Sequence, residues 1–371
     1  MKTVTQLKKL YKKFSIFKEN LYPKDLKGWF GVDKLKVTLK DIKKIVKNYY
    51  HDSFLHFIKK VRDLIFAQNI FLLVKEWSED QWPLFYLVSF LKKEKIIEVK
   101  KDGKIKLLKK ELLKFFPRKR NEKEIQKIIE KKLKTKLNLE AFSNSLFYRK
   151  VVAQYDQFPI SLSSAIFIVK KILDYLPLNK KFLFIGDDDF ISVYLSLTEP
   201  KVESVVVDID EKLLEKIREI SRKFHLKIKT KKLDIRKMKK MNENFIGFSS
   251  NPVYTFEGIK AFLNFGMNQL GKDGGFVFLS VSDEAIGNRI LFLEEFFVKK
   301  RLKIKEVIRE KVYYPFEMVH PEDKILFERW KKFFNENFIK SSPMIGASLW
   351  IFEYVPFNIP KPKKQLFYAY L

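Results

Sequence analysis

The stretch KFLFIGDDDF at residues 181–190 and the stretch VESVVVDID at residues 202–210 decide the fold. Each is a run of apolar residues that ends in a turn rich in aspartate. Continuous apolar runs are typical of strands buried on both faces of a parallel sheet. Apolar residues at helical spacing lie before, between and after these runs, at 164–175, 190–197 and 211–224. The alternation of strands and helices predicts a parallel sheet covered by helices.

The same alternation continues toward the end of the chain. Further strands are expected at 226–234, 244–252, 274–282, 302–314 and 347–354. Further helices are expected at 255–270, 287–300 and 322–338. Because the last two strands follow one another without a full crossover, we expect an antiparallel edge. The expected fold class is therefore α/β, with a Rossmann-like sheet of the methyltransferase type.

The first third of the chain has a different pattern. Residues 1–40 are basic and weakly periodic, which we interpret as a peripheral arm. Helical spacing follows, and then the segment IIEVKKDGKIKLL, in which Asp102 and Gly103 predict the tight turn of a hairpin. Helices followed by a small hairpin indicate a winged-helix-like α+β domain. The expected division is an arm and winged-helix-like domain at 1–114, a basic linker helix at 115–140 and a catalytic domain at 141–371.

Composition excludes several classes of protein. The chain has no cysteine and four scattered histidines, which removes disulfides and thiolate chemistry and leaves little for a metal site. Its net charge is +30, carried by 64 Lys and only 11 Arg. This excess leaves open binding of nucleic acid through the basic N-terminal half. No run reaches the 18 to 20 apolar residues of a membrane span, and the N-terminus has no apolar signal core, so we expect a cytoplasmic protein without membrane contact.

Polar residues gather where the predicted strands end, which is where doubly wound sheets bind ligands. After the first strand, Gly186 permits a turn, and Asp187, Asp188 and Asp189 follow it. Three carboxylates would repel a pyrophosphate, so the expected ligand is a cation. From residue 183 to residue 215 the chain has nine acids and two bases, although the whole chain is strongly basic. This local reversal of sign predicts a pocket built for positive charge.

Three later segments extend the candidate site. The second strand ends in Asp208 and Asp210, either of which could accept hydrogen bonds from ribose hydroxyls. The third strand ends near Asp234, at a position where related folds bind an adenine amino group. The fourth ends in Asn251 and Pro252, followed by Tyr254, a pattern typical of enzymes that alkylate an amine. An isolated polar cluster before the first Rossmann helix could line the cleft, and it consists of Tyr155, Asp156 and Gln157.

Taken together, these motifs resemble those of the branched-chain polyamine synthases of thermophiles, the N(4)-bis(aminopropyl)spermidine synthase family. The Gly-Asp-Asp-Asp turn at 186–189 is the specific element. The resemblance implies a transferase of polyamine biosynthesis that moves an aminopropyl group from decarboxylated S-adenosylmethionine, its co-substrate, to the secondary amine of spermidine. The products would be a branched-chain polyamine and methylthioadenosine. No tightly bound cofactor or metal is expected, and we expect a homodimer.

The resemblance also assigns roles to residues. Asp188 and Asp189 are the candidates for general base and amine anchor, with Asp187 in support. The resemblance places Asn251 among the catalytic residues, although relatives typically have Asp-Pro-Pro-Tyr where this chain has Asn-Pro-Val-Tyr.

Two other functions remain open from the sequence. One is an S-adenosylmethionine-dependent N-methyltransferase that acts on nucleic acid or another amine. The other is a non-catalytic, DNA-binding protein that senses polyamine.

Overall fold

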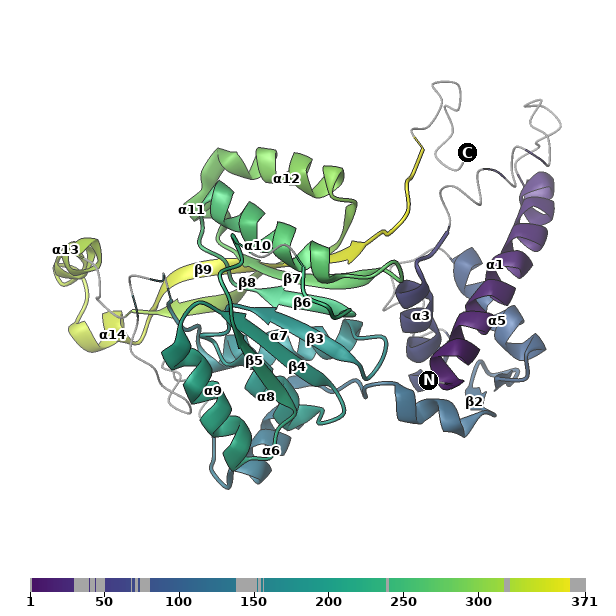
Figure 1. The fold of residues 1–371 in the computed structure, drawn as a ribbon, viewed down its shortest axis with the longest axis horizontal. Coiled ribbons are helices and arrows are strands. Elements are labelled where there is room, and N and C mark those ends of the chain that lie inside the picture. The colour runs from purple at the N-terminus through teal and green to yellow at the C-terminus, as the bar shows by residue number, and fades with distance from the viewer. Residues whose placement is uncertain are drawn as a thin grey trace. The chain divides into compact units, whose positions relative to one another are not determined.

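The computed structural model describes most of the chain as two compact units (Figure 1). The first unit comprises the described residues up to Phe116 and those after Val355, and the second runs from Pro117 to Val355. The described residues are 2–29, 40, 44, 51–67, 69–70, 73, 81–137, 152, 155, 157–237, 240–316 and 321–360. Among them, no helix has the length and apolar character needed to cross a membrane.

The second unit contains the strand and helix alternation expected from the sequence. Its helices are α6 (Glu122–Leu133), α7 (Leu162–Tyr175), α8 (Ile191–Thr198), α9 (Glu211–Lys223), α10 (Phe256–Gln269), α11 (Asp283–Ile286), η4 (Gly287–Arg289), α12 (Ile290–Lys299), α13 (Pro321–Trp330) and α14 (Glu336–Lys340). Its strands are β3 (Lys181–Ile185), β4 (Glu203–Asp208), β5 (Ile228–Lys232), β6 (Gly247–Ser250), β7 (Gly275–Val281), β8 (Leu302–Pro315) and β9 (Pro343–Tyr354).

The seven strands in the described part of this unit form one sheet in the order β5-β4-β3-β6-β7-β9-β8. Strands β3 to β7 are parallel, whereas β9 runs antiparallel to both β7 and β8. Strands β4 and β5 follow β3 on one side of the sheet, whereas β6 pairs with β3 on the other side. The strand order therefore reverses at β3. The predicted fold class, a Rossmann-like sheet of the methyltransferase type with an antiparallel edge, is confirmed.

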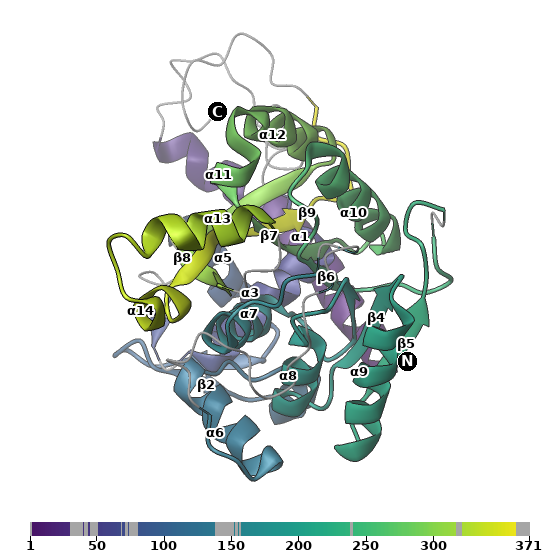
Figure 2. The same ribbon diagram turned by 90° about the vertical axis from the view of Figure 1, so that its left-hand side faces the viewer.

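Helices cover both faces of this sheet. Figures 1 and 2 show α7, α8 and α9 on one face and α10 and α12 on the other. The strands are apolar on both sides because both faces are buried, and Phe182 and Phe184 of β3 are at most 1% exposed. Helix α6 packs against α7 and α8. The helix expected as a linker within 115–140 therefore belongs to the second unit.

The described residues of the first unit form three α-helices, a two-stranded hairpin and one 3-10 helix. Its elements are α1 (Lys2–Trp29), α3 (Phe54–Phe66), α5 (Gln81–Lys93), β1 (Ile97–Val99), β2 (Ile105–Leu107) and η2 (Lys110–Phe115). Strands β1 and β2 pair antiparallel, and Gly103 in the turn between them has φ +81°. Helix α5 packs on β1, and α3 packs on β2. This is the winged-helix-like arrangement expected from the sequence.

The structure corrects the expectation of a peripheral arm at 1–40. Residues 2–29 form helix α1, which packs against α3 and α5. Leu7 and Phe14 on this helix are buried, and the ring of Phe14 stacks on that of Phe57 at 5.0 Å between centroids. Apolar residues one or two helical turns apart lie on the same face of α1 and form its buried stripe. The many lysines between them make this periodicity hard to recognise in the sequence.

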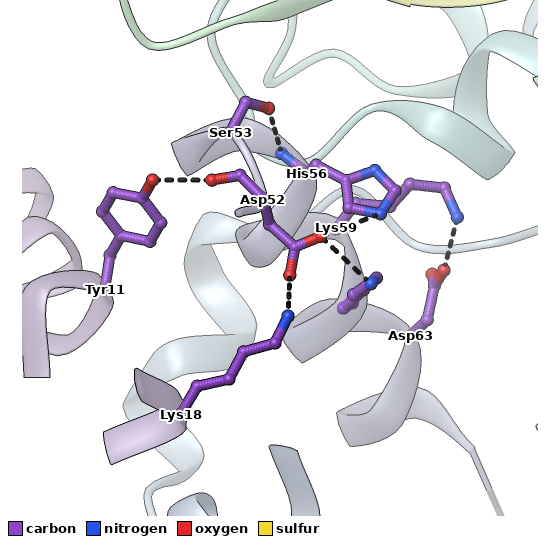
Figure 3. Close-up of polar contacts among 8 residues, drawn as sticks. Tyr11, Lys18, Asp52, Ser53, His56, Lys59 and Asp63 are labelled. Carbon is purple, nitrogen blue, oxygen red and sulfur yellow. Dashed lines mark hydrogen bonds and ion pairs between the residues drawn. The ribbon is translucent and has the colours of Figure 1, made fainter. Parts of the chain in front are cut away.

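A buried ionic cluster joins α1 to the start of α3, as Figure 3 shows. The Asp52 carboxylate lies 3.2 Å from Lys60 Nζ and 3.8 Å from Lys18 Nζ, and Lys18 belongs to α1. Tyr11 of α1 donates a hydrogen bond to the Asp52 carbonyl oxygen at 2.6 Å. Burial alone would raise the pKa of Asp52, but the ammonium groups of Lys60 and Lys18 hold it well below its usual range.

Candidate active site

The carboxyl ends of β3, β4 and β6 meet at the point where the strand order reverses. The register pairs Ile185 of β3 with Val207 on one side and with Ser250 on the other. The residues that follow these strands are therefore neighbours. Gly186 turns the chain here with φ +70°, a conformation that residues with a Cβ atom rarely adopt. The switch point of a doubly wound sheet is where such folds bind ligands.

A cavity of about 400 Å³ opens at this point. Seven residues expected from the sequence line it, namely Tyr155, Gln157, Gly186, Asp188, Asp208, Asp234 and Asn251. The remaining lining residues were not among the candidate site residues, and they are Ile185, Val207, Ile209, Leu233, Ile235, Arg236, Val253, Gly258, Ala261 and Phe262. The cavity thus combines a row of acids with largely apolar walls.

Asp188 is the carboxyl of the Gly-Asp-Asp-Asp turn that lines the cavity. It is 7% exposed, and no lysine or arginine of the described residues forms an ion pair with it. Burial raises the pKa of Asp188 well above its ordinary value, and the carboxylates of Asp189 and Asp208 raise it further. A buried acid among other acids favours the approach of a cation, which relieves both the desolvation and the repulsion.

Asp189 lies beside the cavity without lining it. Its carboxylate accepts hydrogen bonds from the backbone N–H of Ile160 at 2.7 Å and from Asn251 Nδ2 at 3.1 Å. Burial raises the pKa of Asp189 to about 6, although the two hydrogen bonds act to lower it. Asp189 is therefore a carboxyl whose protonation changes just below neutral pH.

Asp187 lies away from the cavity, at the junction between β3 and α8. Its carboxylate accepts hydrogen bonds from the backbone N–H of Ser192, at 3.3 Å, and from the Ser192 hydroxyl. Ser192 lies in the first turn of α8, so Asp187 ties the turn after β3 to the start of that helix. Asp187 is 2% exposed and does not line the cavity. The geometry favours a supporting role rather than direct substrate contact.

The two acids at the end of β4 and in the turn after it also lie in different positions. Asp208 lines the cavity, and its Oδ1 accepts hydrogen bonds from the Asp210 backbone N–H at 2.8 Å and from Gln157 Nε2 at 3.4 Å. Asp210 is the N-cap of α9 and accepts the backbone N–H of Lys212 at 2.9 Å. Of the two ribose candidates, Asp208 is therefore the one that faces the cavity.

Asp234 lines the cavity together with the side chain that pairs with it. The Arg236 guanidinium donates to both carboxylate oxygens of Asp234, at 2.9 and 2.8 Å. These hydrogen bonds lower the pKa of Asp234 to about 2. Arg236 follows Asp234 in the sequence but was not assigned a role in the site, because a single arginine after a strand carries no signal of its own.

Asn251 lines the cavity at the end of β6 and joins a network of hydroxyls. The Tyr314 hydroxyl donates to Asn251 Oδ1 at 2.7 Å, and the Tyr254 hydroxyl lies 3.3 Å from the same oxygen. The two hydroxyls are 2.5 Å apart. Pro252, which follows Asn251, does not line the cavity. Asp156 lies outside the described residues.

Sequence reasoning missed Tyr314, which comes from β8, far along the chain from the other residues. Strand β8 runs parallel to β6 and β7, so its carboxyl end reaches the same edge of the sheet. Burial raises the pKa of the Tyr314 hydroxyl, and the neighbouring Tyr254 and Asp189 raise it further, so Tyr314 remains neutral. The rule that identified the other strand ends could have found Tyr314 if it had been applied to the antiparallel edge.

A comparison with known families decides the relationship. A family model described as the branched-chain polyamine synthase A C-terminal domain matches residues 144–341, more than half of the chain. The chain belongs to this family. This confirms the resemblance seen in the sequence. The matched segment contains every element from α7 to α14, and with them the Gly-Asp-Asp-Asp turn and Asn251.

Individual relatives align over shorter stretches. An uncharacterized protein of Methanocaldococcus jannaschii is 39% identical over 138 residues, which is 37% of this chain and 35% of that protein. The N(4)-bis(aminopropyl)spermidine synthase of the same organism is 36% identical over 95 residues, which is 25% of this chain and 27% of that enzyme. The chain thus spans about a third or less of the length of these curated relatives.

A solved structure is similar at low sequence identity. It is the branched-chain polyamine synthase C9 mutein from Thermus thermophilus, in complex with N4-aminopropylspermidine and 5'-methylthioadenosine. The identity is 15% and the TM-score 0.48, and the match covers 81% of this chain and 87% of that one.

Proposed function

We propose that the protein is an aminopropyltransferase. It moves the aminopropyl group of decarboxylated S-adenosylmethionine to the secondary amine of spermidine, giving a branched-chain polyamine and methylthioadenosine. The observation that carries the proposal is Asp188, a buried carboxyl that lines the cavity, lies among other acids and has no ion-pair partner among the described residues. Membership of the branched-chain polyamine synthase family supports the same reaction.

The donor binds at the β4 side of the cavity in this proposal. Asp208 accepts the ribose hydroxyls, since it ends β4 and faces the cavity. The adenine lies between the apolar side chains of Ile209, Ile235 and Phe262, which line the same cavity. The donor lacks the carboxylate of S-adenosylmethionine and carries a sulfonium and an ammonium group. It therefore tolerates the acids at the first turn, where a carboxylate would be repelled.

The acceptor amine lies against Asp188. Its neutral secondary nitrogen attacks the aminopropyl carbon next to the sulfonium. As the N–C bond forms, the C–S bond breaks, and its electron pair stays on the sulfur of methylthioadenosine. The proton on the new tertiary amine passes to the Asp188 carboxylate. A raised pKa suits this carboxyl for accepting a proton near neutral pH. The acids also offset the repulsion between two cationic substrates, which assists their positioning.

The test is to incubate the purified protein with spermidine and decarboxylated S-adenosylmethionine and to search for a tertiary-amine product by mass spectrometry. We expect that product together with methylthioadenosine in equal amount. Asp188→Asn should lose the product, because it removes the proposed base. Asp174→Asn is its matched control and should keep activity, because Asp174 is an acid of the same unit that pairs with Lys170 on helix α7. Absence of product from the folded wild-type protein under all conditions of pH and temperature tried would refute the proposed reaction.

We also propose that the protein forms a homodimer. Six large apolar side chains between β8 and β9 are more than a third exposed, and they are Ile325, Leu326, Trp330, Phe333, Phe334 and Phe338. Exposed apolar patches of this kind are typical of contact surfaces. Residues 321–342 contain five bases and four acids, so two copies of a chain of net charge +30 could meet here with little repulsion. Light scattering measures the molecular mass of the wild type and of Phe333→Ser in solution. We expect a dimeric wild type and a weakened dimer in the variant, and a monomeric wild type would exclude the proposed dimer.

Binding of nucleic acid through the basic N-terminal half stays a prediction. The test is to measure the affinity of the protein for duplex DNA at several salt concentrations. Binding through basic residues predicts an affinity that falls steeply as the salt concentration rises.

A further inference from the structure

The hydroxyl network around Asn251 defines which way its carboxamide points. Asn251 Oδ1 faces two hydroxyl groups, those of Tyr314 at 2.7 Å and Tyr254 at 3.3 Å. Asn251 Nδ2 faces a carboxylate oxygen of Asp189 at 3.1 Å. In the reverse orientation the amide oxygen would lie against that carboxylate oxygen, which is unfavourable while Asp189 is ionised. The two hydroxyls therefore face the oxygen of the Asn251 carboxamide and the carboxylate faces its nitrogen, so a single orientation of the carboxamide is favoured.

We infer that Tyr314 and Tyr254 are positioning residues that hold the Asn251 carboxamide as a hydrogen-bond donor to the Asp189 carboxylate. Asn251 Oδ1 is then occupied by the tyrosine hydroxyls and does not accept a hydrogen bond from the attacking amine. This differs from the role expected of the pattern at 251–254, which is typical of enzymes that alkylate an amine and in which the side chain would hold the amine nitrogen. Of Asp188, Asp189 and Asn251, Asp188 is the carboxyl that lines the cavity, and it has no ion-pair partner in the described part of the chain. Asp188 is therefore the side chain that contacts the attacking amine.

The consequence concerns the protonation of Asp189. Burial raises the pKa of Asp189 to about 6, and the hydrogen bond from Asn251 opposes that rise. Among the residues that the structure describes, the charged groups that face Asp189 are Asp187 and Asp188 in its own turn. Tyr314, from β8, also faces it. Without the two hydroxyls, Asn251 Oδ1 would lose the donors that fix its orientation, and the ionised form of Asp189 would lose part of its support.

The experiment measures the titration of Asp189 in the ligand-free protein by NMR of aspartate labelled with ¹³C at the carboxyl carbon. The Asp189 signal is assigned by its loss in Asp189→Asn. All variants carry Asp188→Asn, so that Asp189 titrates without its coupled neighbour. The inference deepens the proposed function but is tested without substrate, so either can fail while the other stands.

We expect the midpoint of Asp189 to rise by about one pH unit in Tyr254→Phe/Tyr314→Phe and by less in each single variant. Asn251→Asp should raise it further, because a second carboxylate would replace the donor. Tyr175→Phe is the matched control, since it removes a tyrosine hydroxyl that donates to Glu306 at 2.5 Å outside the cavity, and it should leave the midpoint unchanged.

An unchanged midpoint in the double variant, with a raised midpoint in Asn251→Leu, would overturn the role of the tyrosines. An unchanged midpoint in Asn251→Leu would overturn the donor role of Asn251. Tyr254 is only partly buried, so the single Tyr254→Phe variant remains informative if the double variant does not fold.

Discussion

At the scale of single residues, the three aspartates of the turn after β3 have three different environments. Asp187 is tied to helix α8 through Ser192, Asp189 is held by Ile160 and Asn251, and Asp188 faces the cavity. The sequence predicts that the three acids lie together, because they follow a buried strand. It does not separate their roles, because each role depends on which backbone N–H or side chain lies opposite each carboxylate in the folded chain.

Replacing Asp188 by asparagine should separate activity from stability. The variant should lose aminopropyl transfer by a factor of about 10² to 10⁴, which is the usual contribution of a positioned base. It should also stabilise the ligand-free protein at pH 7.5, because burial and the neighbouring acids raise the pKa of Asp188 and the substitution removes that unfavourable carboxyl. Product formation by mass spectrometry and urea denaturation measure the two effects. A variant that keeps full activity would remove Asp188 from the mechanism.

Asp189 should make stability depend on pH in a defined direction. Its pKa is raised in the folded protein to about 6 from an ordinary value of 3.8, so the folded state retains a proton that the unfolded chain releases. The contribution of Asp189 to the free energy of unfolding is therefore lost as the pH rises through about 6. Relative to Asp189→Asn, the wild type should lose about 2 kcal/mol between pH 4.5 and pH 7.5. A difference that is constant over this range would contradict the raised pKa.

At the scale of elements, periodicity predicted the sheet well. All seven strands of the second unit lie within a few residues of their expected positions, because continuous apolar runs bounded by turns are a strong local signal. The ends of β3, β4, β5 and β6 supplied most of the lining of the cavity. Helix α1 was missed because lysines outnumber the apolar residues of its buried stripe. Tyr314 was missed because the pairing of β8 and β9 is a long-range property of the sheet.

The ionic cluster at the start of α3 should matter for the stability of the first unit. Asp52→Asn leaves Lys18 and Lys60 without their shared carboxylate and should cost about 3 kcal/mol at pH 7. The pKa of Asp52 is lowered in the folded state, so this contribution is present above the unfolded pKa of 3.8 and declines as the pH falls below it. Hydrogen exchange of the α3 backbone amides in urea measures the change.

The control for this prediction is Asp102→Asn. Asp102 pairs with Lys104 at 3.0 Å in the same unit, but both side chains are at least half exposed. This variant should change the free energy of unfolding by less than about 0.5 kcal/mol. Equal effects of Asp52→Asn and Asp102→Asn on the free energy of unfolding would show that the buried cluster stabilises the unit no more than an exposed ion pair does.

At the scale of the whole molecule, a chain of net charge +30 carries a cavity lined by acids. This contrast predicts discrimination between two donors that differ by one carboxylate. Decarboxylated S-adenosylmethionine should bind at least about tenfold more tightly than S-adenosylmethionine, because the extra carboxylate would meet Asp188 or its neighbours. Calorimetric titration of each donor measures the ratio. Tighter binding of S-adenosylmethionine would instead favour a methyltransferase.

Calorimetric titration of spermidine into the protein saturated with methylthioadenosine tests the central claim most directly. The titration is carried out at pH 7 in two buffers of different ionisation enthalpy, which gives the number of protons released. We predict that the polyamine cation displaces protons from the buried acids, and that Asp188→Asn both weakens binding at least about tenfold and releases fewer protons. Equal affinity and equal proton release in the wild type and the variant would contradict a cavity whose carboxylates capture the cationic substrate.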